Sequence, residues 1–240
     1  MKKSIARNLP AQLINSIGSQ IVSGAILPGT VLTADALAEE YGVSRTVVRE
    51  ALKVLHDKGL TRARTKTGTL VLERYEWNLL DPDLLGWLHG SGLGADLMRD
   101  LEEVRESYEP WVARVAAIRR GSKDVAALTS SFKRMELAFK TEGYSSDAVT
   151  VEDLNFHEAM LDATQNELMK QIGRLFTPLL RIRDDLVHTV ITDDRFIQDH
   201  QYVLDSIVDE DPDAAEIAMK KLLATSSKNS KEAIKLKKRK

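Results

Sequence analysis

Residues 42–53 place the tightest constraint on what this chain can fold into. The hydroxyl of Ser44 is suited to cap a helix, because it can accept a hydrogen bond from a free amide of the first turn. The residues after it repeat their apolar positions at helical spacing on one face. The opposite face carries Arg45, Thr46, Arg49 and Lys53. A short helix that is apolar on one side and basic on the other has the form needed to enter a major groove of DNA.

The segments around this helix predict a small domain over residues 1–75. Helical periodicity predicts one helix over residues 9–24, a second over Ala34–Tyr41 and a third over Ser44–Lys58. Two β-like runs follow, Leu60–Arg64 and Thr69–Leu72, and the turn between them contains Gly68. Three helices and a hairpin make a winged helix-turn-helix, with a generic small α+β domain as the alternative.

The charge distribution supports double-stranded DNA as a partner, although the chain as a whole has a net charge of −2. Residues 45–74 contain eight basic residues against three acidic ones, a local net charge of +5. Residues 193–216 contain nine acidic residues and a single arginine. Because phosphate contacts need only a local basic face, the sequence predicts one basic module joined to an acidic one.

Composition excludes several classes of site. The chain has no cysteine, so it can form neither disulfides nor thiolate metal sites, and it has no cysteine nucleophile. No stretch approaches the roughly 18–20 apolar residues that a membrane span requires. The first residues, Met1–Ser4, are not followed by an apolar run, so no secretory signal is expected. We therefore expect a cytoplasmic protein without membrane partners.

The rest of the chain is expected to be almost entirely helical. Residues 76–94 form an apolar junction with two tryptophans and several leucines, and we expect it to pack one domain on the other. From residue 95 to 235, apolar residues recur at helical spacing between short breaks, which predicts an antiparallel bundle. The six predicted helices cover residues 95–120, 122–142, 147–164, 166–191, 194–209 and 211–235.

A polar site is predicted inside this bundle. Asp153 and His157 are four residues apart, so they share one helical face, and apolar neighbours continue that face. His200 also precedes apolar residues at helical spacing. One carboxylate and two imidazoles that converge could hold a divalent cation such as Zn²⁺ and leave positions open for a ligand. A hydrogen-bonded polar cluster without metal is the alternative.

The motif Gly42-Val43-Ser44-Arg45-Thr46-Val47-Val48-Arg49-Glu50-Ala51-Leu52, followed by Gly59-Leu60 and Gly68-Thr69-Leu70-Val71, resembles the winged-helix domain of GntR-family bacterial transcription regulators. The helical remainder is similar to the FadR-type branch, which carries an FCD effector-binding domain. The resemblance covers about residues 10–230. One departure is Leu32-Thr33-Ala34-Asp35, where many members have Leu-Pro-Ser-Glu.

The resemblance implies roles for residues of the winged domain. Arg45, Thr46 and Arg49 would contact bases and phosphates, and arginine can recognise guanine with two hydrogen bonds. Ser44 would cap the helix and contact a phosphate. The tip of the wing would be formed by Lys66, Thr67 and Gly68. The protein would bind a palindromic operator as a homodimer.

The resemblance also implies what the helical domain senses. Asp153, His157 and His200 match three metal ligands of FCD domains, whereas the fourth position falls on Leu222, which cannot coordinate a metal. Arg105 would hold the carboxylate of an effector, with an exposed ion pair to Glu102 or Glu109 as the alternative. A repressor released by a sugar acid is expected, or by another hydroxy acid such as lactate. The alternatives are a metal-dependent enzyme acting on a sugar acid, and a bundle that only dimerises.

Overall fold

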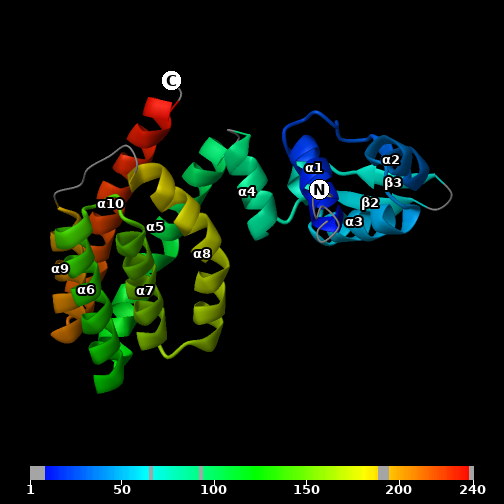
Figure 1. Ribbon diagram of the computed structural model, residues 1–240. Helices are drawn as coiled ribbons and strands as arrows, with labels where there is room; N and C mark the ends of the chain where they lie inside the picture. The colour runs from blue at the N-terminus through cyan, green and yellow to red at the C-terminus, as the bar shows by residue number, and fades with distance from the viewer. Residues whose placement is uncertain (1–8, 65–66, 92–93, 189–194, 238–240) are drawn as a thin grey trace, which may run out of the picture. The chain divides into compact units, whose positions relative to one another are not determined.

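The computed structural model describes residues 9–64, 67–91, 94–188 and 195–237. The chain divides into two compact units, Met1–Gly94 and Ala95–Lys240. Among the described residues, the first contains a small sheet and short helices, and the second contains the helices α5 to α10, which are labelled in Figure 1. The predicted fold class, a winged helix-turn-helix followed by a helical bundle, is confirmed. In the part of the chain that the structure describes, no helix is long and apolar enough to cross a membrane.

The winged helix-turn-helix of the N-terminal unit is built, in its described residues, from three helices and a three-stranded antiparallel sheet. The helices are α1 (Leu9–Val22), α2 (Ala34–Tyr41) and α3 (Arg45–Asp57). The strands are β1 (Val31–Leu32), β2 (Thr61–Arg64) and β3 (Gly68–Val71), in the order β1-β3-β2. The sequence did not predict β1, because a two-residue strand has no period of its own and exists only through its pairing with β3.

Local chemistry sets the start of both helices in the helix-turn-helix. The hydroxyl of Thr33 accepts from the amide of Ala36, and that of Ser44 accepts from the amide of Val47, each at 3.3 Å. Between the two helices Gly42 takes a left-handed conformation, with φ of 63°. Such a conformation strains any residue with a Cβ atom, so glycine is needed for the sharp turn that leads into α3.

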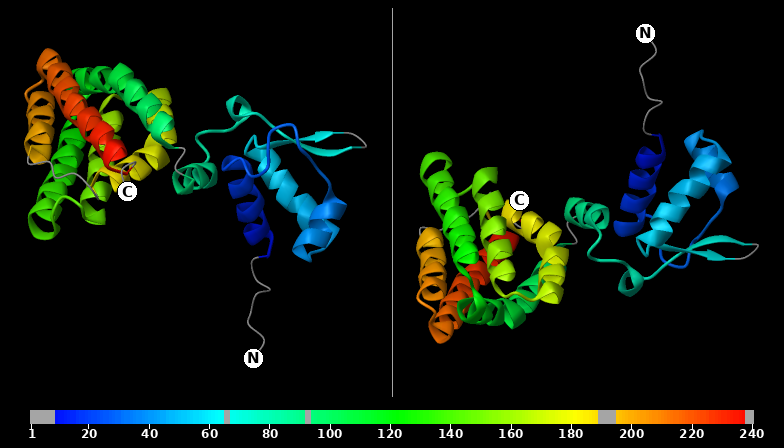
Figure 2. Two further views of the ribbon diagram at one scale, coloured as in Figure 1. Left: turned by 90° about the horizontal axis from the view of Figure 1, so that it is seen from above. Right: turned by 90° about the horizontal axis from the view of Figure 1, so that it is seen from below.

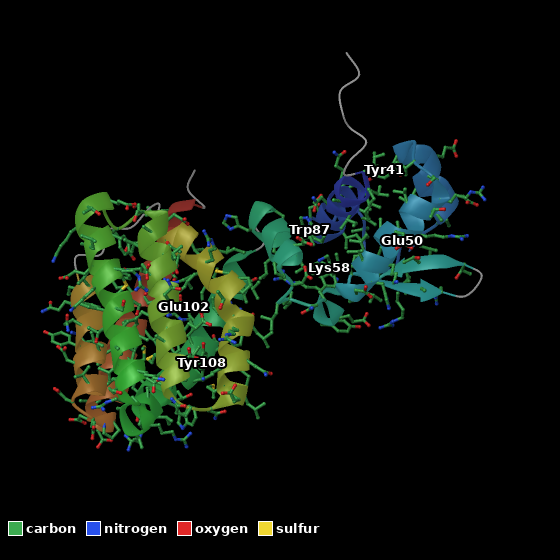
Figure 3. The ribbon with its side chains drawn as sticks, turned by 60° about the horizontal axis from the view of Figure 1, so that its bottom comes forward. Tyr41, Glu50, Lys58, Trp87, Glu102 and Tyr108 are labelled. Atoms are coloured by element: carbon green, nitrogen blue, oxygen red, sulfur yellow. The ribbon has the colours of Figure 1, made fainter. Side chains whose placement is uncertain are left out.

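The predicted junction contains a helix, α4 (Pro82–Gly90), that belongs to the N-terminal unit. Asp81 caps it, since its carboxylate accepts from the amides of Asp83 and Leu84. Leu84, Leu85 and Leu88 on its inner face are buried. α4 packs against α1, and Figure 3 labels Trp87 on it. A short 3₁₀ turn, Arg74–Glu76, precedes this helix.

The described residues of the C-terminal unit form six helices: α5 (Gly94–Arg119), α6 (Ser122–Glu142), α7 (Asp147–Ala163), α8 (Glu167–His188), α9 (Phe196–Val208) and α10 (Pro212–Lys237). α6 packs between α7 and α9, α8 packs on α7, and α10 packs on α9 and α8. The two views of Figure 2 show α10 running beside α9. The observed helices begin and end within a few residues of the predicted ones.

Both polar and apolar side chains fill the interior of the helical unit. Its apolar core includes Leu128, Met135, Phe156, Val203 and Ile207, each fully buried. A second set of buried side chains is charged or titratable: Glu102, Arg105, Glu109, Asp153, His157, Arg183, Asp184, Asp199 and His200. Buried charges are costly unless they are paired or bind a metal, so this set marks where function should be sought.

Candidate DNA interface and metal centre

The outer face of α3 presents the predicted DNA-binding residues to solvent. Arg45, Thr46 and Arg49 are all exposed, as is the capping Ser44. The Nε atom of Arg45 lies 2.8 Å from Oδ1 of Asp35 on α2, and both side chains are 69% exposed. An ion pair this exposed contributes little to stability, so Arg45 can exchange Asp35 for a phosphate or a base at small cost.

The wing is formed by β2 and β3. Thr67 is exposed next to the turn, and Lys66 lies outside the described residues. Gly68 has a φ of 119°, and a Cβ there would lie 2.6 Å from the carbonyl oxygen of Leu32. This glycine is therefore required for the close pairing of β3 with β1, besides any contact that it makes with DNA.

The three predicted metal ligands converge in the helical unit. Asp153 and His157 come from α7 and His200 comes from α9, and each of the three is buried. One ligand atom from each lies within 4.8 Å of the other two. Nε2 of His200 is 2.7 Å from Oδ1 of Asp153, and Nε2 of His157 is 3.7 Å from the same oxygen.

The polar atoms at the centre of this cluster fit a bound cation. Within the described part of the chain, Oδ1 of Asp153 and the Nε2 atoms of His157 and His200 are buried without a hydrogen bond of good geometry. Nδ1 of His200 lies 2.7 Å from the carbonyl oxygen of Phe196. A carbonyl only accepts, so Nδ1 carries the proton and Nε2 keeps a lone pair for a metal.

Without a metal, the electrostatics of the cluster favour an ionised Asp153 and a neutral His157, which are the forms that bind metal, whereas His200 would have to release a proton from Nε2 to bind one. Burial alone would raise the pKa of Asp153, but the contacts with His200 and the charges of His157 and Arg105 together outweigh it, so this pKa lies below its ordinary value. Burial lowers the pKa of His157 and keeps its imidazole neutral. Burial would also lower the pKa of His200, but the carboxylate of Asp153 raises it overall.

Arg105 is buried next to this cluster and is also paired. Its Nε lies 2.7 Å from Oε1 of Glu109, and its Nη1 donates to the hydroxyl of Ser226 at 3.2 Å. Glu102 is more distant, with Oε2 at 3.8 Å from Nη1. The alternative prediction is an ion pair of Arg105 with Glu102 or Glu109 on the surface. Both carboxylates lie near Arg105, but the pairing is inside the helical unit, since Arg105 is 3% exposed.

The sequence did not predict a second buried arginine, Arg183 on α8. It donates from Nε to Oε1 of Glu102 at 3.1 Å and from Nη2 to the carbonyl oxygen of Ser226 at 3.2 Å, and it pairs with Asp184. Burial raises the pKa of Asp184 to about 6 despite this arginine. The local sequence Arg181-Ile182-Arg183-Asp184 is typical of a solvated helix face, so only packing distinguishes Arg183.

The metal cluster and both arginines line one small cavity. Its volume is about 20 Å³, which is enough for roughly one water molecule. An organic effector would require side chains around the cavity to move. Leu222 on α10 also lines it and is buried, but its side chain offers no ligand atom. The cavity therefore brings together the three candidate ligands, the two arginines and the apolar side chain of Leu222.

A winged helix-turn-helix joined to a helical unit with a buried polar cavity defines a ligand-responsive DNA-binding protein. The chain belongs to the GntR family of transcription regulators and carries an FCD domain. Residues 9–71 match the family model described as bacterial regulatory proteins, gntR family, and residues 100–225 match that of the FCD domain. The protein is thus a transcription regulator and not an enzyme, with an N-terminal domain for operator DNA and a C-terminal domain for a small-molecule effector.

Relatives and solved structures agree with this assignment. The galactonate operon transcriptional repressor of Escherichia coli is 32% identical over 230 residues, which cover 94% of this chain and 98% of that protein. The Uxu operon transcriptional regulator of the same organism is 27% identical over 91% of this chain and 86% of its own length. The fold resembles that of Lar, which controls the Listeria monocytogenes agr system, with a TM-score of 0.59, 15% identity and coverage of 93% of this chain and 97% of that one.

Proposed function

We propose that the protein is a repressor that binds a palindromic operator as a homodimer and is released by a sugar acid. The observation that carries this proposal is the cavity in the helical unit, where Arg105 lies beside Asp153, His157 and His200. The likeness over nearly the whole chain to a galactonate operon repressor and to a Uxu operon regulator supports a sugar acid as the effector.

The chemistry of the cavity suits such an effector. A guanidinium matches a carboxylate with two parallel hydrogen bonds, so Arg105 would hold the acid group. Asp153, His157 and His200 would hold a divalent cation such as Zn²⁺, and three protein ligands leave a coordination position open. The cation would supply a Lewis-acid contact for an effector oxygen. The chain lacks the fourth ligand at Leu222, so we expect effector and metal to support each other's binding.

The homodimer is supported by an exposed apolar stripe on α8. Leu168, Ile172 and Leu175 are 71%, 44% and 53% exposed and follow one another at helical spacing along one face. Such a stripe on a long helix suits a second copy of the same helix, and a two-fold dimer would match the symmetry of a palindromic operator. Analytical ultracentrifugation should give a dimer mass, and Ile172→Glu should give a monomer.

The DNA-binding half of the proposal is tested at Arg49. We propose that Arg45, Thr46 and Arg49 contact bases and phosphates, that Ser44 contacts a phosphate, and that Lys66, Thr67 and Gly68 meet the DNA at the wing. Loss of one arginine contact to a base should cost about 1–3 kcal/mol of binding free energy. Arg49→Ala should therefore weaken operator binding roughly 5- to 150-fold in a gel shift at physiological salt.

The matched control is Arg174→Ala, which removes an equally exposed arginine from the helical unit, where it pairs only with Glu158 in the described structure. This variant should bind the operator like the wild type. Circular dichroism should show both variants folded. Full operator affinity in Arg49→Ala would contradict the assignment of α3 as the recognition helix.

The effector half is tested by thermal unfolding with galactonate, gluconate, glucuronate and lactate, each with and without a chelator. A sugar acid should raise the midpoint temperature of the unit that binds it, because a ligand stabilises the state that it binds. The chelator should reduce this shift. If only lactate raises the midpoint temperature, the effector is a smaller hydroxy acid and not a sugar acid. In either case Arg105→Lys should reduce the rise in midpoint temperature.

A further inference from the structure

One buried carboxylate contacts both halves of the candidate effector site. Glu109 lies on α5 and is 3% exposed. Its Oε1 accepts from Nε of Arg105 at 2.7 Å, and its Oε2 lies 3.4 Å from Nη2 of the same arginine. That second oxygen also lies 3.4 Å from Nδ1 of His157. Glu109 therefore stands between the arginine proposed to hold the effector and a histidine proposed to hold the metal.

The two candidate histidine ligands differ in what orients them. Nδ1 of His200 donates to the backbone carbonyl of Phe196, so its ring is oriented by its own helix. Both ring nitrogens of His157 are buried and lack a hydrogen bond among the described residues. Glu109 faces Nδ1, and Asp153 faces Nε2 at 3.7 Å. A carboxylate only accepts, so Glu109 favours a proton on Nδ1 and leaves the lone pair of Nε2 facing Asp153 and His200.

The same carboxylate occupies the donors that an effector would need. Arg105 directs Nε and Nη2 toward Glu109, and its Nη1 donates to Ser226. An incoming carboxylate that forms two parallel hydrogen bonds with the Nε and Nη2 edge of Arg105 takes the donors that Glu109 uses. Glu109 would then be freed to shift toward His157, where it can form a hydrogen bond with a better angle.

We infer that Glu109 couples the metal site to the effector arginine. It orients the imidazole of His157 as a positioning residue. When the effector binds, the effector carboxylate replaces Glu109 as the hydrogen-bond partner of Arg105. Metal and effector then bind cooperatively, because the effector strengthens the contact that orients a metal ligand. By linkage the metal strengthens effector binding by the same factor. The effector half of this inference rests on the proposed function, whereas the metal half does not.

The metal half is tested by titrating the full-length, chelator-stripped protein with Zn²⁺ in competition with a chromophoric chelator. Loss of a group that orients a metal-binding histidine weakens metal affinity about 10- to 100-fold, and Glu109→Gln should show a loss of this size. The matched control is Glu106→Gln, which makes the same change at an exposed position of α5. It should bind Zn²⁺ like the wild type. Equal affinity in Glu109→Gln and the wild type would overturn the inference.

A second measurement distinguishes the loss of His157 orientation in Glu109→Gln from a general loss of structure. Nitrogen NMR of labelled histidine in the metal-free protein reports which ring nitrogen of His157 carries the proton. The wild type and Glu109→Asp, which keeps the charge, should show the proton on Nδ1. Glu109→Gln should shift the population toward the other tautomer while His200 is unchanged. A tautomer that is the same in all variants would overturn the positioning role.

The effector half is tested by repeating the Zn²⁺ titration with galactonate. The wild type should gain metal affinity, and Glu109→Gln should gain less. If Glu109→Gln loses metal affinity but galactonate changes nothing in the wild type, the coupling and the proposed effector are wrong and the positioning role stands. If galactonate strengthens Zn²⁺ binding equally in both proteins, the inference is wrong and the proposed effector stands.

Discussion

At the scale of single residues, Leu222 occupies the position where the four-ligand pattern has its fourth metal ligand, and its side chain cannot coordinate a metal. Its side chain lines the cavity that contains Asp153, His157 and His200. Polar atoms of those three residues are buried without hydrogen bonds in the described structure. An unsatisfied buried polar atom costs about 1–3 kcal/mol, so the cluster is held at a cost that a bound cation would remove.

A histidine at position 222 should complete the site. Leu222→His places a third imidazole, and a fourth ligand, at the cavity, and closing a tetrahedral site should raise Zn²⁺ affinity on the order of tenfold or more. The chelator competition described for Glu109 measures it. Ala224→His is the control, because residue 224 lies on the same helix but is exposed and does not line this cavity. Unchanged affinity in Leu222→His would show that residue 222 does not face the cation.

At the scale of elements, α4 is fastened to the DNA-binding unit at two points. Trp87 packs over Gly18 of α1, where a Cβ atom would lie 2.4 Å from the indole ring. At the other point Nζ of Lys58, which directly follows α3, lies 2.9 Å from both carboxylate oxygens of Asp81 and 2.7 Å from Oδ2 of Asp83. The helix α4 is thus attached to α1 by Trp87 and to the end of α3 by the contact between Asp81 and Lys58.

A methyl group at position 18 should loosen the first attachment. Gly18→Ala forces Trp87 to move, and overpacking of this kind costs about 1–3 kcal/mol of the free energy of unfolding. Urea denaturation measures the loss. Gly86→Ala is the matched control, since a Cβ there meets nothing within 4 Å, and alanine in an open helical position should stabilise by about 0.5–1 kcal/mol. Equal effects of the two variants would contradict this account of Gly18.

The second attachment should depend on charge. Asp81→Asn keeps a good helix cap but removes the carboxylate beside Lys58, whose side chain is 11% exposed. We expect a loss of about 1.5–3 kcal/mol in the free energy of unfolding, the range for a hydrogen bond between charged groups. In a double-mutant cycle with Lys58→Met, the two losses should not add.

The pH dependence of this attachment follows from the pKa of Lys58. Burial alone would lower it, but hydrogen bonds to Asp83 and Asp81 raise it above 10.5. A folded-state pKa above the unfolded one contributes stability that is complete below the unfolded value and is lost as pH rises through the folded value. The difference between wild type and Asp81→Asn should therefore be constant near neutral pH and shrink only above about pH 10.5. A difference that shrinks between pH 7 and 9 would contradict the ion pair.

At the scale of the whole molecule, DNA reading and sensing are assigned to separate compact units, Met1–Gly94 and Ala95–Lys240. The proposed recognition helix α3 lies in the first, and the candidate metal and effector residues lie in the second. An effector can change DNA binding only through a free-energy difference between states that both units share. Each ligand should nevertheless stabilise most strongly the unit that contacts it.

Calorimetry of the full chain should therefore show two unfolding transitions. Zn²⁺ at about 100 times its dissociation constant should stabilise the helical unit by about 2.7 kcal/mol and leave the other transition nearly unchanged. Operator DNA should shift mainly the winged-helix transition. A chelator should reverse the first effect. A Zn²⁺ shift confined to the winged-helix transition would contradict the site at Asp153, His157 and His200.

Local patterns were sufficient for most of the fold. Helical periodicity and caps predicted α2 to the residue and α3 within one residue at each end, because Thr33, Gly42 and Ser44 act on their immediate neighbours. The sequence did not predict the helix α4, because its buried leucines include two adjacent residues and give no clear helical period in so short a segment. The expectation that the junction packs one domain on the other stays a prediction.

The sequence by itself determined the basic face of α3 and the placing of Asp153, His157 and His200 on apolar helix faces. These follow from spacing along single helices, where neighbours three and four residues apart are set by helical geometry. Only the tertiary structure decided that Arg183 and Glu109 are buried with them. The contacts of Arg183 with Glu102 and of Glu109 with His157 join residues on different helices, and a charged residue looks the same in sequence whether its helix faces water or a cavity. The coupling inferred for Glu109 depends on that packing of α5 against α7, which no local pattern records.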